Sequence, residues 1–289
     1  PASTQAANAM IGLTIATLGL STASTSLASL SQRAVRLRES WAVPPPDSST
    51  AHRFDSAYTC GGTEAPRGYC NWLVPGRLML GQYPAEQPSP PGPTSAEAAA
   101  HLQRVLDAGM DAFACLQAEV PPQEVASRWP AGGVPLGGSS GERFPGAFQP
   151  YAPVANRLAA AAGRAPPTYL HHGIEDLSVP ADAARLRRLL DALLTHYEGG
   201  GAAIYVHCWG GRGRAGLVGS ALCALMWPSL GGEAVLESVQ RGYDSRAGAE
   251  AMPAALRRSP QTDSQRDFVR RFARAVCAES GAEEVSTYG

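Results

Sequence analysis

The sequence lacks the features that mark several large classes of protein. Its 289 residues carry 24 basic and 25 acidic side chains, a formal net charge of −1, so no overall field draws the molecule to nucleic acid or to an acidic membrane. It has no CxxC pair and no HExxH stretch, and it therefore offers no metal site of recognisable spacing. We expect no nucleic-acid partner, no metal and no cofactor, and any bound anion must be held locally.

A dense, regular cysteine pattern is also absent. Six cysteines are scattered along the chain, which argues against a disulfide scaffold and favours a reducing compartment. They are Cys60, Cys70, Cys115, Cys208, Cys223 and Cys277. The adjacent His171 and His172 are explained by a position near a strand end as well as by a ligand role.

The first 32 residues lack charge entirely, because they contain no Lys, Arg, Asp or Glu. Three interpretations of this stretch stay open. It resembles an organelle-targeting segment, being rich in Ser, poor in acid and followed by Arg33, Arg36 and Arg38. It is also long enough for a weak membrane-spanning or interfacial helix, and the third interpretation is a helix or tail packed on this or another protein. Residues 1–32 are therefore the candidate contact with a membrane or a protein complex.

Composition divides the chain into three parts. Residues 1–42 form the N-terminal segment, which is uncharged over most of its length. Residues 43–70 contain clusters of Pro and Gly that interrupt any helical or strand period, so we expect a linker there. Residues 71–280 are expected to form one folded domain, large enough to bury a sizeable core.

Short apolar runs alternate with helical patterns within residues 71–280. Strands are expected over 77–83, 111–117, 168–174 and 202–207. Helices are expected over 95–110, 154–164, 181–197, 215–227 and 264–276, with a long Pro/Gly-rich loop over 121–153. Strands separated by helices predict an α/β fold with a central, mostly parallel sheet flanked by helices on both faces.

The stretch HCWGGRGRAG, which follows the 202–207 strand, is the strongest candidate for chemistry. Gly210, Gly211 and Gly213 stand in it between a strand end and an apolar helix. Glycines let the backbone turn tightly with its N–H groups inward, and those donors plus the helix dipole form a nest for a tetrahedral oxyanion. A Walker-type nucleotide loop is excluded, because it ends in Gly-Lys-Ser/Thr and has no cysteine at its start.

Cys208 stands at the mouth of this loop. At a helix N-terminus and close to Arg214, the pKa of its thiol is predicted to lie below the free value of about 8.5, which gives a thiolate at neutral pH. Cys208 is therefore a candidate nucleophile, aimed at whatever anion the nest holds.

His207, Cys208, Gly211 and Arg214 match the signature His-Cys-x-x-Gly-x-x-Arg. The chain resembles the cysteine-dependent protein tyrosine and dual-specificity phosphatases, in particular their compact dual-specificity-like members, over about residues 71–277. The resemblance implies hydrolysis of phosphomonoesters through a phosphocysteine, on phosphotyrosine, phosphoserine or phosphothreonine proteins, with Arg214 gripping two phosphoryl oxygens. The substrate-binding residues it implies are His207, Trp209, Gly210, Gly211, Arg212 and Gly213.

The resemblance implies two further roles. A carboxylic acid on the loop after an upstream strand must protonate the leaving oxygen, and Asp176 is the candidate, with Glu175 and Asp182 as alternatives. Gln261, in the stretch QTDSQRDF, corresponds to a glutamine that positions water for hydrolysis of the phosphocysteine, with Gln265 as a second candidate. The polar, capped start of a helix explains the same stretch.

Two positions bear on how far the resemblance extends. Ala215 stands where most members carry Ser or Thr, so a hydroxyl that assists departure of the thiolate is missing and slower hydrolysis of the intermediate is predicted. Arg212 resembles the extra lysine in this loop of the phosphoinositide phosphatases, or it is a solvent-facing arginine. Two alternative functions stay open: a phosphoglucan or phosphoinositide phosphatase, and a pseudophosphatase that binds phosphate as a binding or assembly subunit.

Overall fold

The computed structural model describes residues 25–59, 66–89, 92–254 and 257–283. Its centre is a five-stranded sheet with the strand order β3-β4-β9-β5-β8. Strand β3 is antiparallel to β4, and all other neighbours in this sheet are parallel. The strands are β3 (Cys70–Val74), β4 (Leu78–Gly81), β5 (Met110–Gln117), β8 (Thr168–Ile174) and β9 (Ala203–His207).

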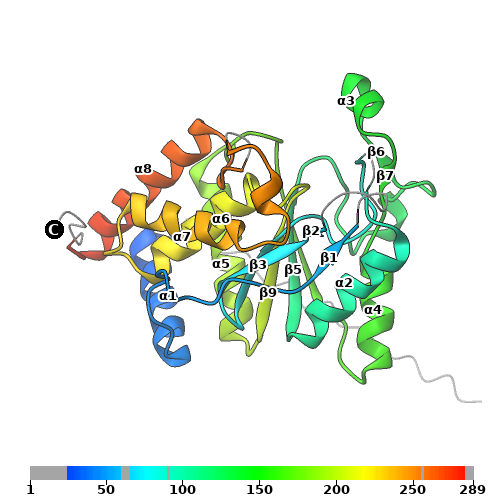
Figure 1. Ribbon diagram of the computed structural model, residues 1–289. Coiled ribbons are helices and arrows are strands. Elements are labelled where there is room, and N and C mark those ends of the chain that lie inside the picture. The colour runs from blue at the N-terminus through cyan, green and yellow to red at the C-terminus, as the bar shows by residue number, and fades with distance from the viewer. Residues whose placement is uncertain (1–24, 60–65, 90–91, 255–256, 284–289) are drawn as a thin grey trace, which may run out of the picture.

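Helices cover both faces of this sheet (Figure 1). One face carries α1 (Leu27–Trp41), α5 (Ala183–Glu198), α6 (Arg214–Met226), α7 (Gly232–Asp244) and α8 (Asp263–Ser280). The other face carries α2 (Ser95–Asp107) and α4 (Ala152–Ala161). The predicted α/β fold, with a mostly parallel sheet between two helical layers, is confirmed.

Several smaller elements lie outside the central sheet and its helical layers. Strands β1 (Ala57–Tyr58) and β2 (Arg67–Gly68) form one antiparallel ribbon, and β6 (Val134–Pro135) and β7 (Ala147–Phe148) form another. Helix α3 (Gly138–Arg143) lies between β6 and β7 and projects from the body (Figure 1). Two 3-10 turns, η1 (Ala126–Arg128) and η2 (Ala249–Ala251), complete the described elements. Ribbon β1–β2 lies in the range expected as a linker, where Tyr58 is buried in the core.

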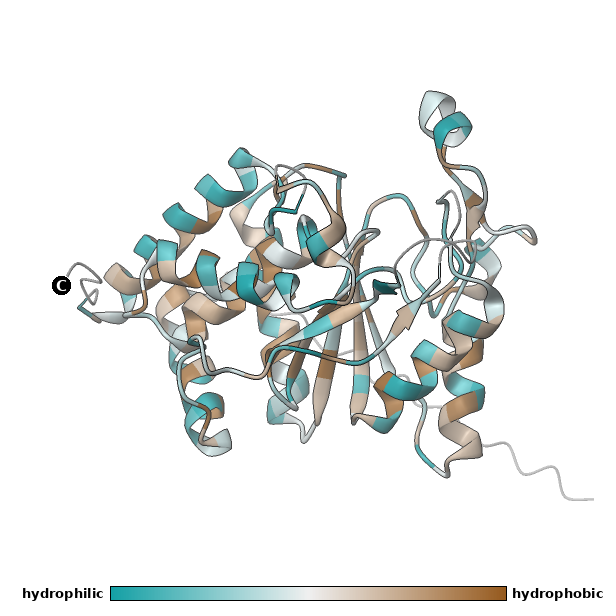
Figure 2. Cartoon of the chain, in the orientation of Figure 1, coloured by the Kyte–Doolittle hydropathy of each residue, from teal (hydrophilic) through white to brown (hydrophobic). Residues whose placement is uncertain are grey.

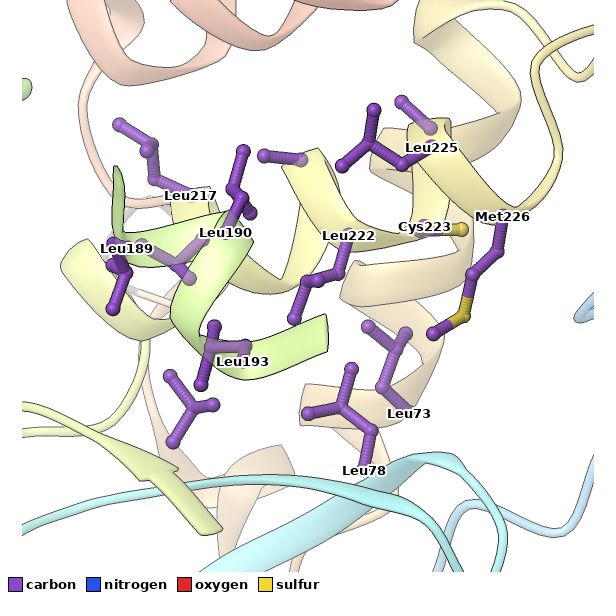
Figure 3. Close-up of a cluster of buried hydrophobic side chains, with 14 of the residues drawn as sticks. Leu73, Leu78, Leu189, Leu190, Leu193, Leu217, Leu222, Cys223, Leu225 and Met226 are labelled. Atoms are coloured by element: carbon purple, nitrogen blue, oxygen red, sulfur yellow. The ribbon is translucent and has the colours of Figure 1, made fainter. Parts of the chain in front are cut away.

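The larger core lies between the sheet and the five-helix layer. Figure 3 shows Leu189, Leu190 and Leu193 of α5 beside Leu217 and Leu222 of α6. Every residue of α6 is buried, which explains why its sequence has no polar face. Because α6 begins where the candidate loop ends, the packing of this helix fixes the position of the loop.

The core on the other face is rich in aromatic rings. The rings of Tyr83 and Tyr151 meet edge to face with their centroids 5.4 Å apart. The ring centroids of Phe113 and Tyr205 lie 5.7 Å apart. Such pairs add to the free energy of burial because the ring edges and faces carry opposite partial charge. Figure 2 shows the resulting pattern, with hydrophobic residues on the central strands and hydrophilic residues along α2 and α8.

Helix α1 occupies the charged end of the N-terminal segment and packs on the domain. Its Leu30 is fully buried in the larger core, and its Arg33 bonds to Asp191 and Glu198 of α5. Most of the uncharged stretch, residues 1–24, lies outside the described residues. Within the described ranges, no helix combines the length and the apolar character needed to cross a bilayer.

All of the strands and helices expected within residues 71–280 are present, with ends that differ by a few residues. No element is among those expected over 232–244, where α7 forms around buried Val235, Leu236 and Val239. Thr94 and Glu97 form a capping box at α2, the local signal that starts this helix where the sequence indicates.

Candidate active site

The candidate loop leaves the centre of the sheet. Strand β9 lies between β4 and β5 and is buried along its whole length, so Cys208 begins the loop at the carboxyl end of a central strand. Helix α6 then starts at Arg214, with Gly213 as its N-cap. Ligands of parallel sheets bind at this edge, where a helix N-terminus also supplies partial positive charge.

Three carbonyls of the loop are held from outside it. The pairs are Trp209 O with Tyr83 N at 2.9 Å, Gly211 O with Arg246 Nη2 at 2.9 Å, and Arg212 O with Ser259 Oγ at 3.0 Å. A trans peptide directs its N–H group opposite to its carbonyl. The N–H groups of Gly210, Arg212 and Gly213 therefore point to the inner side, as an anion nest requires. None of these three donates a hydrogen bond within the part of the chain that the structure describes.

Gly211 is the residue that lets the loop close on the sheet. Its φ is +69°, in the left-handed region, and a Cβ at this position would stand 2.3 Å from the backbone nitrogen of Gln82. Both the backbone angle and the close approach exclude a side chain here. Around Gly210, by contrast, nothing lies within 4 Å of the place where a Cβ would stand, so this glycine faces the open side of the loop.

Arg214 gathers the charged groups of the site. It is 1% exposed, and its Nη1 donates to Ile174 O at 3.0 Å and to Glu119 Oε2 at 2.6 Å. Its Nη2 lies 3.0 Å from Asp176 Oδ1. Burial alone lowers the pKa of Arg214, but electrostatic interaction with Cys208, Glu119 and Asp176 and the hydrogen bond to Glu119 outweigh burial and raise it. The site therefore holds a permanent cation beside a cysteine that is itself only 3% exposed.

Glu119 belongs to this site, and the sequence patterns do not reveal it. It stands two residues after β5, the strand next to β9, so both strand ends open on the same edge of the sheet. Its side chain is 21% exposed, and its Oε1 is buried with no hydrogen-bond partner among the described residues. The sequence does contain one signal for Glu119: it is an acidic residue just past the carboxyl end of a predicted strand, where ligands of parallel sheets bind.

Asp176 is the predicted acid that the structure brings to Arg214. It lies on the loop after β8, and its side chain is 47% exposed. The alternative Asp182 caps α5, because its Oδ1 accepts a hydrogen bond from Arg185 N at 2.6 Å. Glu175 is exposed and forms no ion pair within the described ranges.

The two predicted glutamines have different surroundings. Gln261 Oε1 lies 3.3 Å from the place where a Cβ of Gly213 would stand, so its carboxamide lies against the loop. Gln265 is buried, and its Oε1 accepts from Gln261 N at 3.1 Å and from Thr262 N at 3.2 Å. Its Nε2 donates to Ser178 O at 2.9 Å. Gln265 therefore caps α8 and ties it to the Asp176 loop. Its Oε1 and Nε2 also lie 3.3 Å from the place where a Cβ of Gly213 would stand, so both glutamines lie against the candidate loop.

His207 and Trp209 brace the loop from the aromatic side. His207 Nε2 lies 2.7 Å from Tyr151 Oη, and burial lowers the pKa of His207 to about 3, so the imidazole is neutral near pH 7. Trp209 Nε1 donates to Pro88 O at 3.1 Å, and its ring meets the Phe144 ring edge to face at 5.2 Å. Tyr151, the partner of His207, and Phe144, the ring partner of Trp209, both lie in the 121–153 region.

Two guanidinium nitrogens of the loop region, Nη1 of Arg212 and Nη2 of Arg214, are buried and have no hydrogen-bond partner among the described residues. The contact of Arg214 Nη2 with Asp176 is an ion pair without a hydrogen bond. Buried donors of this kind are rare in folded proteins. A tetrahedral oxyanion supplies strong acceptors for such guanidinium donors.

The structure offers no comparable arrangement for a metal. Within the described ranges, no group of three or more His, Cys, Asp and Glu residues is placed to hold an ion. His171 Nε2 pairs with Gln117 O at 3.0 Å. The five described cysteines are free, and Cys60 lies outside the described residues.

No protein-family model and no curated protein matches the sequence. Solved structures of tyrosine-phosphatase type do match it. Tk-PTP in its active form is 17% identical, covers 77% of this chain and 99% of its own, and has a TM-score of 0.41. The kinase associated phosphatase with a catalytic Cys-to-Ser substitution is 16% identical, covers 75% of this chain and 98% of its own, and has a TM-score of 0.44. A PTP-like phytase from Bdellovibrio bacteriovorus is 14% identical, covers 83% of this chain and 97% of its own, and has a TM-score of 0.43. At these scores the likeness carries no functional argument, and the residues of the loop must carry it.

Proposed function

We propose that the protein hydrolyses phosphomonoesters through a phosphocysteine formed on Cys208. The observation that carries this proposal is the convergence of the inward N–H groups, the α6 N-terminus and the buried Arg214 on the start of the loop. These groups favour both a thiolate and a bound phosphoryl dianion. No metal or cofactor takes part in the proposed reaction.

In the first step the Cys208 thiolate attacks phosphorus in line with the leaving oxygen. The S–P bond forms as the P–O bond breaks, and Asp176 in its acid form gives its proton to the leaving oxygen. Arg214 holds two equatorial oxygens of the transferring group. The 3.0 Å contact between Arg214 Nη2 and Asp176 Oδ1 supports this division of roles, since the two side chains would meet the same phosphoryl group.

In the second step water attacks the phosphocysteine. Asp176, now a carboxylate, accepts a proton from that water, and Gln261 orients the water against the loop. The P–S bond breaks, inorganic phosphate leaves and the Cys208 thiolate returns. The carboxamides of Gln261 and Gln265 both lie near Gly213, and Gln265 already holds three hydrogen bonds, so we assign this role to Gln261.

The substrate class we favour is a phosphoprotein with phosphotyrosine, phosphoserine or phosphothreonine. Leu177, next to Asp176, is 50% exposed, and no other large apolar side chain is exposed in the part of the chain that the structure describes. An apolar group at the rim of an otherwise polar site suits the side chain that carries a phosphoryl group, above all an aryl ring.

A second candidate substrate class is a polyol with several phosphates, such as a phosphoinositide. It is favoured by Arg212, a further cation in the loop whose Nη1 is buried and has no partner within the described ranges. A second phosphate would satisfy that donor. Phosphoglucan is the third candidate class.

Turnover of p-nitrophenyl phosphate in the presence of EDTA tests the reaction. We expect hydrolysis, inhibition by vanadate, and loss of turnover in Cys208→Ser, with a phosphorylated Cys208 trapped by rapid acid quench of the unaltered protein. Cys277→Ser is the matched control, a free cysteine of α8 that is partly exposed. Full turnover in Cys208→Ser would contradict the proposal. Tungstate binding without any turnover would instead favour the pseudophosphatase.

Phosphate release from a phosphopeptide, amylopectin and a phosphoinositide separates the substrate classes. We expect the phosphopeptide to be used best. If Arg212 grips a second phosphate, Arg212→Gln lowers kcat/KM on the inositol lipid far more than on p-nitrophenyl phosphate. An equal loss on both assigns Arg212 to the general electrostatics of the loop.

A further inference from the structure

Arg246 follows α7 and connects three separate parts of the protein. It is 5% exposed. Its Nε donates to Asn71 Oδ1 on β3 at 2.8 Å, and its Nη2 donates to Leu80 O on β4 at 2.9 Å and to Gly211 O in the candidate loop at 2.9 Å. The guanidinium is planar and its donors are fixed relative to one another. The loop is therefore aligned on the two strands at the edge of the sheet through one rigid group.

The bond to Gly211 decides which way one peptide of the loop faces. If the peptide between Gly211 and Arg212 turned over, a carbonyl oxygen would enter the nest and the Arg212 N–H would leave it. Glycine makes such a turn inexpensive, since it has no Cβ to restrict its backbone angles. Arg246 opposes the turn by holding the carbonyl outward.

The charge of Arg246 is also unusual. Its three acceptors are neutral, and within the described ranges no carboxylate lies at ion-pair distance from it. The Tyr243 ring lies beneath the guanidinium, with Cζ 4.7 Å from the centroid. A buried cation is costly unless an opposite charge compensates it. Arg214 already has two carboxylates, whereas an anion in the nest would be the first negative partner of Arg246.

Ser259 holds the next peptide in the same way. It is buried, its Oγ donates to Arg212 O at 3.0 Å, and its own N–H donates to Gln240 Oε1 on α7 at 2.8 Å. The chain that follows α7 thus supports two successive peptides of the loop from behind.

We propose that Arg246 is a positioning residue of the candidate anion site, which keeps the Gly211–Arg212 peptide in its anion-binding orientation and adds a positive potential behind it. This inference rests on the proposed function, because it concerns the same loop. Arg246 itself touches neither the nucleophile nor the phosphoryl group in the proposed reaction.

The test compares the full-length protein with Arg246→Met, Arg246→Lys and Arg241→Met. Arg241 is the matched control: it lies on α7, its Nη2 donates to Pro46 O at 3.2 Å, and it makes no bond to the loop. Three quantities are measured: the dissociation constant of inorganic phosphate by calorimetry, kcat and KM on p-nitrophenyl phosphate, and the alkylation rates of Cys208 by anionic iodoacetate and by neutral iodoacetamide.

We expect Arg246→Met to weaken phosphate binding about tenfold to a hundredfold, as loss of a charged hydrogen-bond donor does. The ratio of iodoacetate to iodoacetamide rates should fall, since that ratio reports the positive potential at the nest. Arg246→Lys should keep the ratio close to that of the unaltered protein but still weaken phosphate, because an ammonium cannot span all three acceptors. Arg241→Met should change none of these quantities.

Phosphate binding in Arg246→Met equal to that of the unaltered protein would overturn the assignment of Arg246 while leaving the hydrolysis proposal standing. If Arg246→Met does not fold, Arg246→Lys decides, and unchanged phosphate affinity in that variant overturns the assignment. An unaltered protein that neither binds phosphate nor hydrolyses the aryl ester contradicts the proposed function instead, so the two failures are distinguishable.

Discussion

Nη1 of Arg214 donates to Oε2 of Glu119 across 2.6 Å, and this bond joins the first residue of α6 to the loop after β5. The carboxylate fixes the guanidinium in the absence of substrate. It also places a negative charge beside the position that a phosphoryl dianion would take. Glu119 is thus expected both to orient Arg214 and to compete with the anion for its charge.

Replacing Glu119 by Gln separates these two effects. The amide oxygen still accepts the hydrogen bond, but the repulsion of the dianion is removed, so phosphate should inhibit about threefold to tenfold more strongly. Glu119→Ala also removes the acceptor, and we expect a lower kcat there because Arg214 is less well oriented. The phosphate inhibition constant and kcat of both variants check this. Weaker phosphate inhibition in Glu119→Gln would contradict it.

Asp176→Asn removes the proposed acid without changing the size of the side chain. We expect kcat to fall about a hundredfold to ten-thousandfold for an ester with a poor leaving group. The loss should be much smaller for p-nitrophenyl phosphate, whose leaving oxygen needs less help from a proton. Asp182→Ala serves as control: it removes the α5 cap, should cost about 1 kcal/mol of stability, and should leave kcat unchanged. Equal losses on both esters would remove Asp176 from the role of acid.

Ala215 bears on the second step. It is fully buried and directly follows Arg214 at the start of α6. A hydroxyl here is expected to donate to the departing thiolate, so Ala215→Ser should speed hydrolysis of the phosphocysteine and raise kcat severalfold. Stopped-flow traces should show a burst of nitrophenolate in the unaltered protein and a smaller burst in the variant. Ala221→Ser, at a buried position further along α6, is the control and should leave the burst unchanged.

The candidate loop was predictable from the sequence because its signals are local. The glycines, the cysteine and the arginine occupy fixed offsets between an apolar strand and an apolar helix, and the backbone geometry follows from those offsets. The leucine spacing of α5 is local in the same sense. Asp176 was assigned through the family resemblance, which implies an acid on the loop after an upstream strand.

Glu119, Arg246 and Ser259 could not be found in this way, because their contacts join residues far apart in the chain. Glu119 stands 95 residues before Arg214, and Arg246 follows Gly211 by 35. An arginine just past the end of a helix ordinarily indicates favourable interaction with the helix dipole at a solvated surface. Only the packing of α7 against β3 turns this one inward. Helix α7 itself was not among the expected helices, although Val235, Leu236 and Val239 recur at helical spacing in its sequence.

Two of the buried histidines, His101 and His207, predict how stability depends on pH. Burial lowers the pKa values of both His101 and His207 from the ordinary 6.5 to about 3. Between these values the unfolded chain binds protons that the folded protein excludes, so stability is full above about pH 6.5 and is lost as the pH falls towards 3. Urea midpoints measured across this range should decrease steadily. His101→Gln removes one of the two groups and should flatten the decrease, whereas an unchanged slope would rule out His101 as its source.

Leu177 combines exposure with backbone strain at the rim of the site. Its φ is +59°, a left-handed conformation that costs a residue with a Cβ about 1–2 kcal/mol. Its carbonyl accepts from Thr262 Oγ1 at 3.4 Å, and a turn from Glu175 to Ser178 encloses it. Strain of this kind concentrates at functional sites, and here it holds an apolar side chain next to Asp176.

Leu177→Gly and Leu177→Ala separate the strain from the contact. Glycine should raise the free energy of unfolding by about 1 kcal/mol, because the left-handed conformation costs it nothing, whereas alanine keeps the strain. Both variants lack the apolar side chain, so both should lose about threefold to tenfold in kcat/KM on an aryl phosphate. A small alkyl phosphate, which does not reach the rim, should be affected little. Thermal unfolding and the ratio of the two kcat/KM values provide the measurements, and equal losses on both esters would show that Leu177 makes no contact with the leaving group.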